Sequence, residues 1–305
     1  MKLSHAIERY VAQKHLDGVR FANGEGVLKR LLGEIGDRPL KRVTTSQVTS
    51  YLQAAKTLPV SWWAKYRLLK IFFSYWMMRG EMNALPMPRP RPAHRPPFKP
   101  LVFSKSELHQ VFGTIQSHSQ KGRWTIEPIT LRTVLLFLYG TGTHINEVLS
   151  LAEADVDLTK KLITLCRDPA RSTRTIPIGS SLRASLSLYL AHSRDRRRQG
   201  AGLFVDREGR SLTRARLNFA FDRVRRFAAR VEPGIRLASL KDFRHTFAVH
   251  CLNRWLNEGK DLRQMLPILA VYMGHVKWTW TEQYLSATPE RFWNQLSHLG
   301  LEHSR

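Results

Sequence analysis

Apolar residues recur every three or four positions through the first 85 residues, which is the spacing of helices that bury one face. The pattern predicts four helices, over residues 4–15, 25–35, 45–55 and 61–79. Thr45 and Ser46 are candidate N-caps for the third helix, because a short hydroxyl side chain can accept a hydrogen bond from a free backbone N–H at a helix start. We therefore expect residues 1–85 to form a small, all-helical domain.

A second set of helical patterns begins at residue 103. Ser104 and Glu107 form a capping-box pattern ahead of one helix, and the apolar spacing over 128–139 predicts another. From residue 181 to the end of the chain the spacing is again mostly helical. These patterns predict a second domain, residues 103–305, that is also rich in helix.

Strand patterns interrupt this second domain. LITLC (162–166) and TRTIPI (173–178) predict two short strands on either side of a turn. GLFVD (202–206) is a further strand candidate. The predicted fold class is therefore mainly α with a small β element, made of an all-helical first domain and a mixed α/β second domain.

Residues 86–102 separate the two domains. Within them, PMPRPRPAHRPPFKP (86–100) holds seven of the chain's fifteen prolines. Proline cannot continue a helix and favours extended backbone, so we expect a semi-rigid linker. Its cations can lie along DNA phosphates, or the stretch can be a solvated spacer with incidental charge. The candidate DNA contacts here are Arg89, Arg91, Arg95 and Lys99.

Composition narrows the partner. The 305-residue chain carries 49 Lys and Arg against 24 Asp and Glu, a formal charge of +25, which points to a polyanion and first to nucleic acid. No membrane span is expected, because the longest apolar run, VLLFLYG (134–140), is far shorter than the roughly 20 residues that a spanning helix needs. No secretory signal is expected at the N-terminus. Cys166 and Cys251 are too few for a disulfide framework or a zinc site, and we expect two buried thiols.

Residues 191–230 form the densest positive region, with twelve arginines, no lysine and four acidic residues. Some of these arginines must line a solvated helix face. Arginine at this density on a basic chain is nevertheless expected to face phosphate, and affinity for DNA should then fall steeply with salt. Candidate DNA contacts outside the linker are Arg174, Arg214 and Arg216.

Two segments near the C-terminus carry the candidate chemistry. SLKDFRHTFAVHCLNRW (239–255) predicts a helix with Lys241 and Arg244 on one face, although Arg244 alone is equally typical of a structural ion pair. His245 and His250 lie five residues apart and so on different faces, which argues against a metal site.

The second segment, LPILAVYMGHVKWTWTEQYLSATPERFW (266–293), holds a Gly-His pair followed nine residues later by a tyrosine. A chain of this length can fold His275 and Tyr284 toward one pocket. By spacing alone, Tyr284 is also simply one aromatic residue among several.

Together these segments resemble the tyrosine recombinase (phage integrase) superfamily, and most nearly the transposon-borne members that occur in adjacent sets. The similarity covers nearly the whole chain and is most specific in 239–293. The resemblance places Arg244 at the family's second catalytic arginine, His275 in its Gly-His motif and Tyr284 at its nucleophile. It also implies a helical core-binding (SAM-like) domain and a mixed α/β catalytic domain that clamp DNA.

The resemblance further implies a mechanism that needs no metal or nucleotide cofactor. Tyr284 would attack a phosphodiester and become joined to the 3′ phosphate, and the 5′ hydroxyl of a partner strand would later attack that bond. Cations must stabilise the phenolate and the transition state. The implied partners are double-stranded DNA and further copies of the chain, as dimers to tetramers, or related recombinases, at the nucleoid of a prokaryotic cytoplasm.

A tail helix is expected at about 287–300. Pro289 can start a helix, and an apolar stripe follows it at Phe292, Trp293, Leu296 and Leu299. The resemblance implies that this tail packs into a neighbouring protomer, and packing onto its own domain is the alternative. Either arrangement would cover the apolar stripe.

The chain departs from the family in its glycine turn, GTGTHINEVLSL (140–151), which has His144 where the family has its first catalytic arginine. The turn lacks the endings of a nucleotide loop or a dinucleotide fingerprint, and the resemblance implies that it holds the scissile phosphate. Histidine offers phosphate fewer donors than arginine. Losing one preorganised donor typically costs ~10²–10³ in rate.

Two further positions also depart. Lys241 stands where the family has a histidine, and it offers a cation or, when deprotonated, a base. The family's hairpin lysine is missing from CRDPARSTRTIP (166–177). Arg167 or Arg171 is the candidate replacement as general acid or phosphate clamp, although arginine donates protons poorly.

Three departures in one site leave two main interpretations. In the first, the protein is an active site-specific recombinase or integrase of a mobile element with a rearranged site, because the nucleophile is retained. In the second, it is a catalytically impaired accessory subunit that binds DNA ends and works with partner recombinases. A topoisomerase-like relaxing enzyme would share the chemistry and is a third, weaker alternative.

Overall fold

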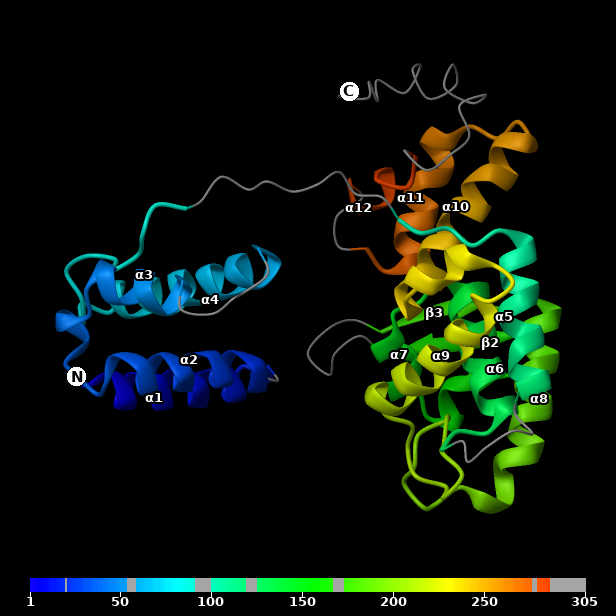
Figure 1. The fold of residues 1–305 in the computed structure, drawn as a ribbon, viewed down its shortest axis with the longest axis horizontal. Helices are drawn as coiled ribbons and strands as arrows, with labels where there is room; N and C mark the ends of the chain where they lie inside the picture. The colour runs from blue at the N-terminus through cyan, green and yellow to red at the C-terminus, as the bar shows by residue number, and fades with distance from the viewer. Residues whose placement is uncertain are drawn as a thin grey trace. The chain divides into compact units, whose positions relative to one another are not determined.

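The computed structural model describes residues 1–19, 21–53, 59–90, 100–118, 125–166, 173–275 and 279–285. The chain divides into two compact units, Met1–Arg95 and Pro96–Arg305, so the boundary falls inside the proline-rich stretch. Helices dominate both units, and all the strands among the described residues lie in the second (Figure 1). The predicted class, mainly α with a small β element, is confirmed.

Four helices build the first unit, as the apolar spacing predicts. They are α1 (Leu3–Leu16), α2 (Ala22–Ile35), α3 (Thr45–Gln53) and α4 (Pro59–Met77). Their apolar faces share one core, in which the Tyr10 ring meets the Phe72 ring edge-on at a centroid distance of 5.2 Å. This unit therefore has a hydrophobic core of its own.

Side chains cap two of the helix starts. The Thr44 hydroxyl accepts a hydrogen bond from the backbone N–H of Gln47, so the cap of α3 lies one residue before the two predicted candidates. Ahead of α5 (Lys105–His118), Ser104 and Glu107 exchange side-chain-to-backbone hydrogen bonds of 2.7 and 3.1 Å, which confirms the predicted capping box.

The second unit is built around α6 (Pro128–Thr141), most of whose side chains are buried. This helix contacts α5 (Lys105–His118), α8 (Ser180–Ser193) and α10 (Leu240–Asn257). The remaining helices are α7 (Ile145–Ser150), α9 (Arg214–Ala228), α11 (Leu262–Met273) and α12 (Thr279–Glu282). Helices α10, α11 and α12 adjoin one another in the gold-to-red part of the ribbon in Figure 1.

A small antiparallel sheet with the strand order β1-β2-β3 completes this unit. Its strands are β1 (Val156–Asp157), β2 (Leu162–Leu165) and β3 (Arg174–Pro177). Ile163 pairs with Ile176, and both side chains are buried in the core. The two predicted strands are thus confirmed, while β1 is too short to show an alternating pattern.

The strand predicted at 202–206 is wrong. This segment makes only an isolated bridge between Val205 and Ser211. Its apolar character has another cause, because Leu203 and Phe204 are buried in the core of the second unit. A short apolar run can serve a loop that plugs a core as well as a strand.

Three further features of the chain bear on the sequence-based expectations: its cysteines, its possible membrane spans and its possible metal sites. Cys166 is exposed, which contradicts the expectation of two buried thiols, and Cys251 is partly buried; both are free. Among the described residues, no helix is long and apolar enough to cross a membrane. The same part of the chain contains no group of three or more His, Cys, Asp or Glu side chains arranged to hold a metal ion.

Candidate active site

The turn between α6 and α7 depends on a glycine in the left-handed conformation. α6 ends at Thr141, and Gly142 follows with φ 59° and ψ 21°. A Cβ at Gly142 would lie 2.2 Å from the Phe247 ring of α10, so the close approach also requires glycine. His144 is the N-cap residue of α7 and is exposed. The turn therefore presents His144 at the surface.

Glu147 and Arg174 form an ion pair beneath this turn. The nitrogen Nη1 of Arg174 lies 2.5 Å from Oε1 of Glu147, and Nη2 lies 3.1 Å from Oε2. Glu147 also accepts a 2.8 Å hydrogen bond from the backbone N–H of His144. Burial acts to raise the pKa of the Glu147 carboxyl, but the hydrogen bonds from Arg174 and His144 hold it below its ordinary value.

Arg174 makes further hydrogen bonds inside the unit, and its expected contact with DNA stays a prediction. Its Nε donates to the Tyr272 carbonyl at 3.1 Å, and its Nη2 donates to the Met273 carbonyl at 3.3 Å. The side chain is 17% exposed. Arg174 therefore ties β3 to the start of α7 and to the end of α11.

Arg244 lies on the second turn of α10 and is almost fully buried, at 5% exposure. Its Nη1 donates to the Gly142 carbonyl, and its Nη2 donates to the Met273 carbonyl at 3.0 Å. Burial lowers the pKa of Arg244 to about 10, with the Tyr284 hydroxyl and the Glu147 carboxylate acting in the opposite direction. The guanidinium thus remains a cation at neutral pH, fixed between the glycine turn and α11.

The Gly-His pair follows α11 directly. Gly274 ends the helix in the left-handed conformation, with φ 70° and ψ 37°, and the backbone N–H of His275 donates to the Ala270 carbonyl at 2.9 Å. The His275 Nδ1 lies 2.7 Å from the Thr281 hydroxyl. This helix end holds the imidazole near Tyr284, with ring centroids 6.3 Å apart.

Tyr284 follows α12 and is 3% exposed. Its hydroxyl lies 2.9 Å from Nδ1 of His245 on α10. Burial raises the pKa of the Tyr284 phenol, and the charge and hydrogen bond of Arg244 act to lower it. The phenol oxygen therefore lies in contact with a guanidinium and an imidazole, although Arg244 and Tyr284 are forty residues apart in the sequence.

This geometry agrees with a match of the chain to a known sequence family. Residues 103–291 match the phage integrase family, a span that includes every residue of the pocket. The chain belongs to the phage integrase family. It is a tyrosine recombinase of the integrase superfamily, as the resemblance of its C-terminal motifs indicates.

Individual relatives of this tyrosine recombinase cover most of its length. The tyrosine recombinase XerC of Staphylococcus saprophyticus is 26% identical over 286 residues, which span 92% of this chain and 83% of XerC. The Tn1549 transposon integrase in complex with a circular intermediate DNA has the same fold, with a TM-score of 0.68, 17% identity and coverage of 92% and 94% of the two chains. A lambda integrase tetramer bound to a Holliday junction gives a TM-score of 0.66 at 14% identity, covering 100% of this chain and 80% of that one.

The structure places Arg244, His275 and Tyr284 of this recombinase close together. Lys241 is exposed on the first turn of α10, so it lies at the surface end of the helix that carries Arg244. His144 is exposed at the start of α7. Arg167 and Arg171 lie outside the described residues, and whether either replaces the family's lysine stays a prediction.

The remaining candidate DNA contacts differ in their surroundings. Arg89 and Arg214 are exposed. Arg216 is partly buried and forms an ion pair with Asp206, which leaves its guanidinium less available than expected. The other three linker candidates lie outside the described residues: Arg91, Arg95 and Lys99.

Many arginines of the region 191–230 form ion pairs within their own unit, and the expected contact of this region with phosphate stays a prediction. Six of its twelve arginines are ion-paired with carboxylates of the same unit. These six are Arg196, Arg197, Arg210, Arg216, Arg225 and Arg226. Much of the local positive charge therefore stabilises the loops and helices of this unit.

Two site residues were missed by the sequence reasoning. Glu147 stands three residues after His144, at the position where a capping box has its carboxylate, so the turn did contain a signal for it. His245 was considered only as a metal ligand. The sequence around His245 gave no sign of its role, because His245 and Tyr284 lie 39 positions apart in the chain.

Proposed function

We propose that this protein is a site-specific DNA recombinase or integrase of a mobile element, which cuts and rejoins DNA through a 3′-phosphotyrosine at Tyr284. The observation that carries the proposal is the hydrogen bond between the buried Tyr284 hydroxyl and the Arg244 guanidinium. A buried cation next to a phenol favours the phenolate and can stabilise the negative charge that builds up on the attacked phosphate. Membership of the integrase family supports the same chemistry.

Each candidate site residue has a role in this proposal. Arg244 is the principal phosphate clamp, because its planar fork stays charged and can donate two hydrogen bonds. Lys241 adds a mobile cation at the surface end of α10. His275 borders the nucleophile from the end of α11. His144 belongs to the turn whose Gly142 carbonyl is bonded to Arg244, and it supplies at most a weaker contact than arginine.

A second candidate function is a DNA-end-binding subunit that works with partner recombinases. It is favoured by the burial of the pocket, since Tyr284 is 3% and Arg244 5% exposed. Both donating nitrogens of Arg244 are also bonded to backbone carbonyls. Attack on DNA requires these groups to be uncovered, and a partner could be needed for that step.

The proposed partners are double-stranded DNA and other recombinase protomers, in the cytoplasm of a prokaryotic cell. Solved relatives include an integrase on circular intermediate DNA and a tetramer on a Holliday junction. The charge of +25 supports a polyanionic ligand. In this proposal residues 1–85 form the core-binding DNA-binding domain, 86–102 the linker and 103–305 the catalytic domain.

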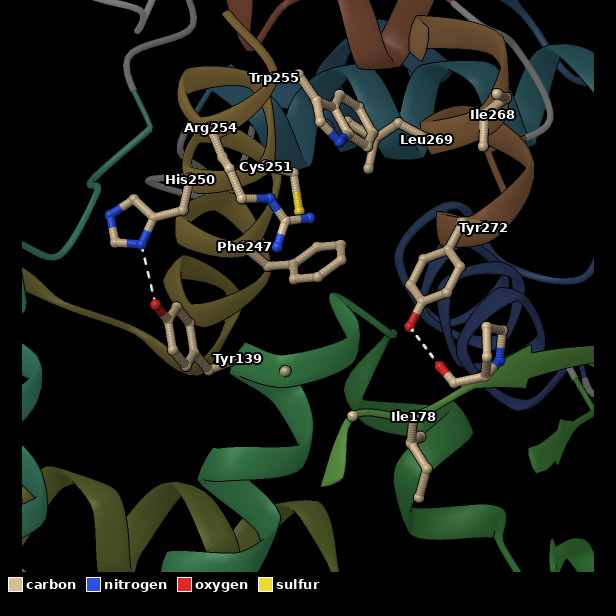
Figure 2. A pocket seen from close by; sticks show the side chains of 13 residues that line it. Tyr139, Ile178, Phe247, His250, Cys251, Arg254, Trp255, Ile268, Leu269 and Tyr272 are labelled. Atoms are coloured by element: carbon tan, nitrogen blue, oxygen red, sulfur yellow. Dashed lines mark hydrogen bonds between the residues drawn. The ribbon is translucent and has the colours of Figure 1, made fainter. Parts of the chain in front are cut away.

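We further propose that an apolar cleft of the catalytic unit receives the tail of a neighbouring protomer. The cleft measures about 660 Å³ and lies between α6, α10 and α11. Figure 2 shows Phe247, Trp255 and Leu269 among its lining side chains, with Ile268 at 56% exposure on the same helix as Leu269. The apolar stripe predicted at 287–300 lies outside the described residues and is the proposed occupant.

Trapping of a covalent adduct tests the catalytic proposal. The wild-type protein is incubated with nicked suicide DNA that carries the ends of the element encoding it, and the products are separated on a denaturing gel. We expect a protein–DNA adduct that is absent with Tyr284→Phe. DNA binding without any adduct, under conditions where a partner recombinase restores cleavage, would favour the accessory subunit instead.

Truncation tests the proposed assembly. A chain that ends at residue 287 should bind one DNA site as well as the full chain does, because the DNA-contacting units are kept. Its multimeric complexes on paired sites should be lost in native gels or sedimentation. Unchanged multimers would contradict docking of the tail into a neighbour.

A further inference from the structure

The hydroxyl of Tyr284 has a proton acceptor in the structure, the imidazole of His245. Nδ1 of His245 lies 2.9 Å from the Tyr284 oxygen, and the two ring centroids are 5.5 Å apart. His245 is on α10, while Tyr284 follows α12, so the bond joins two separate elements. We propose that His245 is a catalytic residue that orients the Tyr284 hydroxyl and accepts its proton, an inference that rests on the proposed function.

The two neighbours of the hydroxyl divide the tasks of donor and acceptor. Arg244 can only donate a hydrogen bond, so Tyr284 accepts from it. An imidazole nitrogen without a proton can only accept, so the Tyr284 O–H then donates to Nδ1 of His245. This arrangement polarises the phenol toward phenolate from both sides.

The surroundings keep His245 in the form that this role requires. Burial is the main cause that lowers the pKa of His245, and the cations Arg244 and Lys241 lower it further, against the opposing effect of Asp242. The ring is therefore neutral at pH 7, so one of its two nitrogens is a hydrogen-bond acceptor. With Nδ1 as the acceptor, its proton lies on Nε2.

The attack of Tyr284 on the phosphodiester exchanges one bond to phosphorus for another. The Tyr284 oxygen forms a bond to phosphorus while the bond from phosphorus to the 5′ oxygen breaks. The Tyr284 proton passes to Nδ1 of His245, and the departing 5′ oxygen takes up a proton from solvent. Transfer to His245 becomes favourable as the bond to phosphorus forms, because the phenol oxygen loses basicity in that process.

Substitution of His245 tests the inference on the full-length protein. His245→Asn can place an amide oxygen near the position of Nδ1, so it can keep the hydrogen bond but cannot accept the proton; His245→Ala removes both. We expect single-turnover adduct formation at saturating suicide DNA to fall on the order of 100-fold in both variants, with DNA affinity unchanged. His192→Asn, at an exposed ion pair on α8, is the matched control and should react like wild type.

A second arm separates proton transfer from positioning. Incorporation of a fluorinated tyrosine of lower pKa at residue 284 should recover part of the rate lost in His245→Asn, because less proton transfer is then needed. An adduct rate of His245→Asn within about twofold of wild type would overturn the inference while leaving the proposed function intact. Absence of any Tyr284-dependent adduct from wild type would overturn the proposed function, and the inference with it.

A third measurement does not depend on activity. Nitrogen-15 NMR of the DNA-free protein, with His245→Asn used to assign the signal, reports which ring nitrogen carries the proton. We expect a neutral ring at pH 7 with the proton on Nε2. A proton on Nδ1, or a charged imidazolium, would overturn the inference even if the protein cleaves DNA.

Discussion

The carboxylate of Glu147 accepts hydrogen bonds from both terminal nitrogens of Arg174. The same carboxylate holds the backbone N–H of His144, and the same guanidinium holds the carbonyl of Met273. Arg244 donates to that carbonyl as well. A single ion pair therefore links the turn, the sheet and the end of α11 around Arg244.

The first prediction concerns the stability provided by this pair. Glu147→Gln leaves the Arg174 cation buried without its counter-charge and should lower the free energy of unfolding by about 3–5 kcal/mol. Glu258→Gln, which breaks an exposed pair with Lys260, is the control and should have little effect. Urea denaturation measures both. Equal stability of the two variants would contradict the role given to Glu147.

A second prediction follows from the lowered pKa of Glu147. The carboxyl of the unfolded chain keeps its ordinary value of about 4.5, above that of the folded chain. The stability from this group is therefore fully present above about pH 4.5 and is lost as the pH falls through the folded pKa. The stability difference between wild type and Glu147→Gln should shrink in that acid window, as measured by denaturation at a series of pH values. A constant difference would rule out a depressed pKa.

The third prediction compares two glycines. Gly142→Ala should be destabilising, because its Cβ would lie 2.2 Å from the Phe247 ring and its φ of +59° is strained for alanine. Gly113→Ala, inside α5 with open space around its Cβ position, should instead be neutral or stabilising by up to about 1 kcal/mol. Thermal unfolding distinguishes the two. Similar midpoints for both variants would show that the turn relaxes around the added methyl group.

The fourth prediction addresses the departure at the glycine turn. His144→Arg should raise the rate of adduct formation roughly 10- to 100-fold, because it supplies the phosphate donors that histidine lacks. Asn146→Arg adds the same charge at an exposed position two residues away and serves as the control. No gain in His144→Arg, or an equal gain in both, would mean that the turn does not hold the phosphate.

Much of the fold was predictable because helices that bury one face repeat apolar residues every three or four positions. The four helices of the first unit and the strands β2 and β3 follow local spacing that tertiary packing did not override. The short strand β1 and the core-plugging loop at 202–206 were not predictable, because two to five residues carry too little periodicity. Local capping signals were the most precise, as Ser104 and Glu107 illustrate.

The residues of the candidate site were predictable only where they belong to sequence motifs. Arg244, His275 and Tyr284 were singled out by the resemblance of their motifs to the family, and the structure places them close together. The partner of Arg174 and the contact of His245 with Tyr284 join residues 27 and 39 positions apart. No local pattern encodes such contacts. The density of arginines in 191–230 did not indicate their ion pairs, because composition does not reveal which arginines contact carboxylates in the fold.

The most direct test of the central claim identifies the residue that carries the DNA. The adduct formed by the wild-type protein on suicide DNA is digested with nuclease and protease, and the modified peptide is sequenced by mass spectrometry. We expect a nucleotide joined through its 3′ phosphate to Tyr284. Attachment at another tyrosine, such as Tyr272 or Tyr139, would contradict it.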